Sequence, residues 1–115
     1  MKTAALALDG AALLSGCATT VPVAVISERD GTLRGTSTAT RSEGAIRVAN
    51  ERMTCTGTYD PLTQTPTIGF VFQCSDGRRG FVVVTRTTPT SGHGTVRMSD
   101  GSTANLVFGD AAAAF

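Results

Sequence analysis

The sequence predicts a small all-β domain: an antiparallel meander of about six or seven strands that curls into a barrel or folds as a compact sandwich. Short segments rich in Thr, Val, Ile and Phe alternate apolar and polar side chains, which is the two-residue period of half-buried strands. Turn sequences recur between these segments, and no helical period follows residue 30. Glycines inside the expected strands favour the more strongly coiled barrel (Gly35, Gly57, Gly69 and Gly80).

Residues 17–30 are expected to form a tether that leads into the first ordered segment. Pro22 and the charged end of this segment argue against a helix, while the alternation of Val21, Val23 and Val25 leaves an edge strand open. The small β-domain is expected over 31–109. Its expected strands are Leu33–Arg41, Ala45–Asn50, Met53–Tyr59, Thr67–Cys74, Gly80–Thr88, Gly94–Ser99 and Thr103–Gly109.

Asp-Gly pairs mark three of the expected hairpin turns. They are Asp30-Gly31, Asp76-Gly77 and Asp100-Gly101, and each joins two expected strands. Asp-Gly is typical of type I′ turns, whose two central residues need positive φ. The prolines of Asp60–Pro66 predict a loop, and the Ala-rich tail at 110–115 is expected to fray or to form a short helical turn.

The first seventeen residues follow the order of an exported leader. Lys2 precedes an apolar run, Ala4 to Leu14, that is too short for a transmembrane helix. The tetrapeptide Leu14-Ser15-Gly16-Cys17 resembles a bacterial lipobox, although Asp9-Gly10 interrupts the apolar run. This resemblance implies a signal peptide at 1–16, acylation of Cys17 and, because Ala18 follows, an outer-membrane anchor facing the periplasm. An ordinary secretory leader is the alternative.

The remaining cysteines predict a structural disulfide. If Cys17 carries lipid, one pair is left, Cys55 and Cys74, and an oxidising envelope favours its oxidation. Both residues lie on the apolar faces of their expected strands. The bond would close a loop of about twenty residues and contribute about 3 kcal/mol.

Charge argues against a nucleic-acid partner. Without Lys2 and Asp9 of the leader, the ten basic and nine acidic residues fall to nine and eight, and no basic block remains. Arg78 and Arg79 are adjacent on an expected strand and therefore point to opposite faces. We expect a solvated strand end there; an anionic partner that also meets Arg52 is the alternative.

Candidate catalytic groups are few. His93, the single histidine, lies in a glycine-flanked segment, Ser91–Gly94, that is expected to be a turn. A catalytic triad would have to recruit Ser91 or Ser99 together with Asp76 or Asp100, and no Gly-x-Ser-x-Gly elbow is present. The turn aspartates could instead bind calcium, yet the chain has no Asp-x-Asp-x-Asp-Gly loop. We therefore expect no enzyme activity, no metal and no cofactor.

A broader resemblance covers most of residues 31–109. The motifs Cys55–Asp60, Cys74–Gly80, Ser91–Gly94, Asp100-Gly101 and Phe108-Gly109 resemble small Gly- and Thr-rich proteobacterial envelope lipoproteins. That group has no assigned activity to transfer, so the resemblance implies fold and location only. Two functions are expected from it: a lipid-anchored protein that contacts an envelope partner, or a small barrel that binds an apolar ligand or a glycan.

Overall fold

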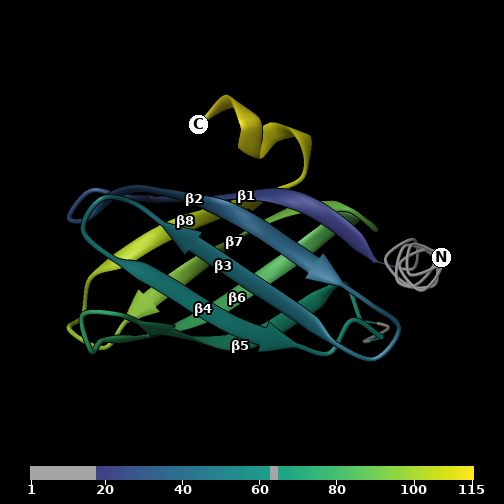
Figure 1. Cartoon of the computed structure of the whole chain (residues 1–115), viewed down its shortest axis with the longest axis horizontal. Coiled ribbons are helices and arrows are strands. Elements are labelled where there is room, and N and C mark those ends of the chain that lie inside the picture. The colour runs from purple at the N-terminus through teal and green to yellow at the C-terminus, as the bar shows by residue number, and fades with distance from the viewer. Residues whose placement is uncertain (1–17, 63–64) are drawn as a thin grey trace, which may run out of the picture.

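The chain folds into a closed barrel of eight antiparallel strands, seen in a computed structural model that describes residues 18–62 and 65–115 (Figure 1). Each strand pairs with its neighbours in sequence, and β1 pairs with β8 to close the barrel. The prediction of an all-β meander that curls into a barrel is therefore confirmed. The elements are β1 (Thr19–Ser27), β2 (Gly31–Ala39), β3 (Gly44–Ala49), β4 (Thr54–Tyr59), β5 (Thr67–Cys74), β6 (Arg79–Thr88), β7 (Ser91–Met98), β8 (Thr103–Phe108) and a 3-10 helix, η1 (Asp110–Ala114).

The strand count is eight rather than six or seven because most of the expected tether is a strand. Residues 19–27 pair with β2 along nine residues and with β8 along five. Val23 and Val25 enter the core. Pro22 pairs with Thr36 of β2 and comes one residue before the first pair of the β1–β8 ladder, a ladder-end position at which proline is tolerated.

Two glycines that suggested a turn at Ser91–Gly94 instead allow close strand approach. The segment begins β7 and pairs with both β6 and β8. A Cβ at Gly92 would overlap the carbonyl oxygen of Thr85, and one at Gly94 would overlap that of Val83. These positions therefore need glycine because the backbones pack closely there, and the turn expected at this place is wrong.

Alternating side chains fill the barrel, as expected for eight strands, whose interior is just wide enough to hold them. Three aromatic rings line one wall: the Tyr59 and Phe70 ring centres are 5.9 Å apart, and Phe70 meets Phe72 edge-on at 5.5 Å. Phe72 is the largest fully buried side chain. The core consists of Val23, Val25, Leu33, Ile46, Val48, Met53, Cys55, Ile68, Phe70, Phe72, Cys74, Val82, Val84, Val96, Met98, Ala104 and Leu106.

The predicted disulfide joins Cys55 on β4 to Cys74 on β5, so this prediction is confirmed. It bridges the shortest ladder of the barrel. The β4–β5 pairing holds two residue pairs, Cys55 with Cys74 and Thr56 with Gln73, whereas every other ladder holds five to nine. The covalent bond therefore reinforces the seam that has the fewest backbone hydrogen bonds.

The tail forms the short helix that the sequence allowed. η1 lies against the outer side of β1 (Figure 1). Ala24, which points outward from β1, is fully buried, and Ala112 of η1 is 4% exposed. The N–H of Gly109 donates to the carbonyl of Pro22, which ties the start of η1 to β1. The helix thus covers one apolar position on the outside of the barrel.

Candidate functional site

The Asp-Gly turns are not of the expected type I′. Gly77 and Gly101 have φ of 93° and 91°, but no residue other than glycine has a positive φ in the ranges described. The N–H of Gly77 donates to the carbonyl of Cys74, so Ser75 and Asp76 are the central residues and glycine follows them. A turn of this kind, completed by a left-handed glycine, is the common longer hairpin connection.

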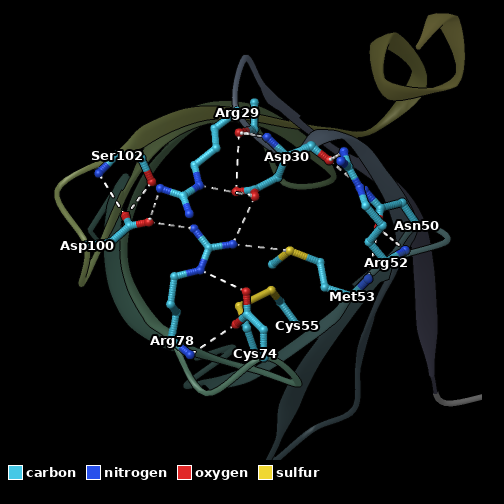
Figure 2. Close-up of polar contacts among 12 residues, drawn as sticks. Arg29, Asp30, Asn50, Arg52, Met53, Cys55, Cys74, Arg78, Asp100 and Ser102 are labelled. Carbon is cyan, nitrogen blue, oxygen red and sulfur yellow. Dashed lines mark hydrogen bonds and ion pairs between the residues drawn. A yellow bond between two sulfur atoms is a disulfide. The ribbon is translucent and has the colours of Figure 1, made fainter.

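These turns gather at one end of the barrel, because alternate connections of a meander lie at the same end. This end, formed by the β1–β2, β3–β4, β5–β6 and β7–β8 connections, is called the charged end here. The carboxylates of Asp30, Asp76 and Asp100 converge there on the guanidinium of Arg78. Their N–O distances to Arg78 are 3.0, 2.8 and 3.0 Å, respectively. Figure 2 shows Asp30 and Asp100 on either side of this guanidinium.

Arg78 crosses the charged end rather than pointing to solvent. Its side chain is 15% exposed, and its Nη2 also lies 3.4 Å from the sulfur of Met53, which belongs to the core. Arg29 adds an ion pair of 2.8 Å to Asp100 (Figure 2). The expectation of a solvated strand end is therefore wrong for Arg78, because three turns fold their carboxylates over it, whereas Arg79 is exposed.

The β3–β4 connection joins the same network through the backbone. Asn50 Nδ2 and Arg52 Nη2 donate to the carbonyl oxygen of Asp30 at 2.8 and 2.7 Å. Asn50 Oδ1 accepts the N–H groups of Arg52 and Met53. Arg52 and Arg78 thus meet at Asp30, a residue of this chain.

The pKa values reflect these contacts. The hydroxyl and N–H of Ser102 donate to Asp100 and, with Arg78 and Arg29, lower its pKa to about 2. The N–H of Arg78 is the main cause that lowers the pKa of Asp76. The carboxylates, Asp30 first, raise the pKa of the Arg78 guanidinium above its ordinary value. Asp76, Asp100 and Arg78 are therefore charged at neutral pH, and each of the two carboxylates lies beside the Arg78 cation.

This arrangement suits a structural closure of the barrel. Four connections are tied to one another by charge-assisted hydrogen bonds, which are stronger than neutral ones. Within residues 18–62 and 65–115 no group of three or more His, Cys, Asp or Glu side chains is placed to hold a metal ion. The predicted turn residues Asp76, Gly77, Asp100 and Gly101 do form turns, and their aspartates also belong to this closure.

The opposite end, called the open end here, carries an apolar pocket of about 120 Å³. Five core side chains and the buried Ser37 line it, and its other lining residues are less buried. Every strand except β7 contributes to the lining. The buried residues are Ser37, Ile46, Ile68, Phe70, Val84 and Leu106, and the others are Thr19, Val21, Ala39, Tyr59, Pro61, Arg86, Pro89, Thr90 and Phe108.

Two hydroxyl groups form a hydrogen-bonded pair in the pocket wall, whose other polar residues are Thr19, Arg86 and Thr90. Ser37 Oγ and Tyr59 Oη are 2.6 Å apart, and the Ser37 residue is 7% exposed. At the same end, Arg86 donates from Nη2 to the carbonyl of Thr65 at 2.8 Å. The pocket thus combines an apolar interior with a few polar groups, among them the partly buried Ser37–Tyr59 pair, which is the composition of a site for a small, mostly apolar molecule.

The residues considered for catalysis do not come together. His93 is exposed on β7, where it pairs with Thr85 and Val107. Ser91 bonds to Thr88 at 2.6 Å near the open end. Ser99 lies at the charged end, where its Oγ accepts the N–H of Arg79. These hydroxyls serve turns and strand ends.

Sequence reasoning missed both the charge cluster and the pocket. The cluster had a usable indication: in a meander, alternate connections share an end, so three Asp-Gly turns and the Arg that follows one of them should meet. No sequence feature indicated the pocket, because the pocket depends on which side chains the strand register brings to the same level along the barrel. Ser37 and Tyr59 are 22 positions apart and showed no common motif.

The predicted lipobox, Leu14 to Cys17, lies outside the described residues. Among those that are described, no helix is long and apolar enough to cross a membrane. Comparison with known proteins gives no relative for this chain: no family model, no curated protein and no solved structure matches it.

Proposed function

We propose that this chain is a lipid-anchored envelope protein without enzymatic activity, and that the open end of its barrel binds a small apolar molecule. The observation that carries the proposal is the difference between the two ends. One end is closed by the ion pairs of Arg78, while the other holds an apolar pocket. A barrel that served only as a rigid spacer would gain stability from a filled interior at both ends.

The size of the pocket limits what it can hold. A dry apolar cavity of about 150 Å³ accommodates benzene, so 120 Å³ fits one small ring or a short branched chain. A ligand of about seven heavy atoms that buries only apolar surface should bind with a Kd on the order of 1 mM. A glycan is too large and too polar for such a site.

The anchor part of the proposal is supported by the tetrapeptide ending at Cys17 and by the position of the first strand. Thr19 lines the pocket, and two residues span at most about 7 Å. A lipid on Cys17 would therefore hold the open end toward the membrane, where apolar molecules are concentrated. The native protein, purified from membranes, should have the mass of residues 17–115 plus acyl chains; an unlipidated mass contradicts the anchor.

The binding part is tested by titrating the oxidised protein with toluene while the methyl NMR signals of Ile46, Ile68 and Val84 are followed. We expect saturable shifts at these three residues. Ala39→Phe should abolish the shifts, because Ala39 lines the pocket and the new ring occupies it. Ala45→Phe is the matched control, since Ala45 is exposed on the outside of β3, and it should bind like the unchanged protein. No saturable shift in the unchanged protein would overturn the proposal.

A further inference from the structure

The hydroxyl pair in the pocket wall, of which Ser37 is buried and Tyr59 is half-buried, has one hydrogen atom more than its own bond uses. Ser37 and Tyr59 each carry one O–H donor. One of the two hydrogens forms the 2.6 Å bond between them, and no other hydrogen bond of either hydroxyl is found in the described parts of the chain. The hydroxyl that accepts this bond therefore directs its own hydrogen elsewhere, and both groups line the pocket.

The fold holds this pair in place. Ser37 and Tyr59 come from β2 and β4, which lie on either side of β3. Gly44 of β3 pairs with Tyr59, and a Cβ at Gly44 would overlap the Tyr59 ring, so the absence of a side chain there makes room for the ring. The ring also packs against Phe70. The Tyr59 ring thus lies over Gly44, and its hydroxyl is hydrogen-bonded to Ser37.

We propose that the pocket selects a small neutral molecule that joins an apolar body of about six carbons to one hydrogen-bond acceptor oxygen, a carbonyl or an ether, which accepts from the Ser37–Tyr59 pair. This inference rests on the proposed function, because it names the ligand class of the same pocket. A ligand that covers this hydroxyl pair removes it from water, and a donor left there without an acceptor is costly. A ligand oxygen at this point accepts the free hydrogen, while the ligand carbons contact the apolar lining. A pure hydrocarbon leaves the donor unsatisfied.

The test compares two ligands of equal shape, cyclohexanone and methylenecyclohexane, on two forms of the oxidised protein. The second form carries Ser37→Ala and Tyr59→Phe together. Replacing both partners by apolar groups of similar shape should be close to neutral for folding, and thermal unfolding checks this. Kd is measured for each combination by methyl NMR titration, and the four values form a thermodynamic cycle that isolates the oxygen–hydroxyl interaction.

We expect the double substitution to weaken cyclohexanone binding about five- to tenfold and to leave methylenecyclohexane binding unchanged or improved. The carbonyl stretch of bound cyclohexanone should also lie at a lower frequency in the unchanged protein than in the variant. Equal changes for both ligands would overturn the acceptor inference while leaving apolar binding intact. Failure of both ligands to bind the unchanged protein would overturn the proposed function itself.

Discussion

Reduction of the Cys55–Cys74 bond should lower the free energy of unfolding by about 3 kcal/mol. The two cysteines are 19 positions apart. For a closed loop of about twenty residues, the chain-entropy relation gives about 11 cal/mol/K, which is about 3 kcal/mol at 25 °C. For a domain of roughly a hundred residues, a loss of this size lowers the midpoint of thermal unfolding by about 15 °C.

The location of the bond predicts which part of the barrel loses local stability first. Because the β4–β5 ladder has only two residue pairs, the reduced barrel has one seam held by few hydrogen bonds. Amide exchange should therefore rise in β4 and in the β5 residues facing it before it rises in the nine-pair β1–β2 ladder. Reduction removes no side-chain atoms from the core, so it creates no large cavity.

The assay compares oxidised and reduced protein by urea unfolding and by amide exchange under native conditions. NMR spectra of the reduced form establish that the barrel is still folded before stabilities are compared. A stability difference below about 1 kcal/mol would refute the loop-entropy reasoning. Exchange that increases first across β1–β2 would refute the identification of β4–β5 as the weak seam.

Three further predictions concern the charged end and the strand contacts. Arg78→Met should destabilise the barrel by about 2 kcal/mol in urea unfolding, because three carboxylates lose their shared cation. Arg79→Met, at the exposed neighbour, should change the stability by no more than about 0.5 kcal/mol. Equal losses in the two variants would contradict a stabilising role of the cluster. The pKa of Asp100 is lowered from 3.8 to about 2, so its contribution to the stability of the fold is complete above pH 4 and is lost as the pH falls toward 2. A thermal unfolding midpoint that stays constant down to about pH 2 would contradict this. Gly35→Ala should prevent folding or strongly destabilise the barrel, because its Cβ would overlap the carbonyl oxygen of Arg47. Gly69→Ala should be tolerated, because its Cβ would stay 3.7 Å from its nearest neighbours. Circular dichroism distinguishes the two outcomes, and equal behaviour of the two variants would contradict the close strand contact at Gly35.

The fold class could be predicted because it depends on local patterns. Alternation in Thr67–Cys74 identifies a strand and its inner face without knowledge of its partners, and the same pattern places Cys74 inward. The N-terminal strand was harder to recognise, since Pro22 and a charged turn hid it and its pairing with β8 joins residues some eighty positions apart. At Gly92 and Gly94, the residue type alone could not distinguish a turn from two backbones in close contact.

The site could be predicted only in part, because it depends on contacts that the closed barrel creates. Asp76 and Asp100 were correctly expected in turns, but their meeting with Arg78 requires that the connections lie at one end. The Ser37–Tyr59 pair requires a register across three strands. Each of these residues is ordinary in its own segment, and the arrangement exists only after strands that are distant in sequence have paired.

The strand order also bears on how the chain acquires this arrangement. Seven of the eight ladders join consecutive strands, so each can form after a short loop closes, which costs little chain entropy. The β1–β8 ladder alone brings together the two ends of the barrel sequence, and we expect this slower closure to complete folding. The pocket has walls from both β1 and β8. A newly made chain would thus present an open apolar sheet, and a place for a ligand would arise only with the last step.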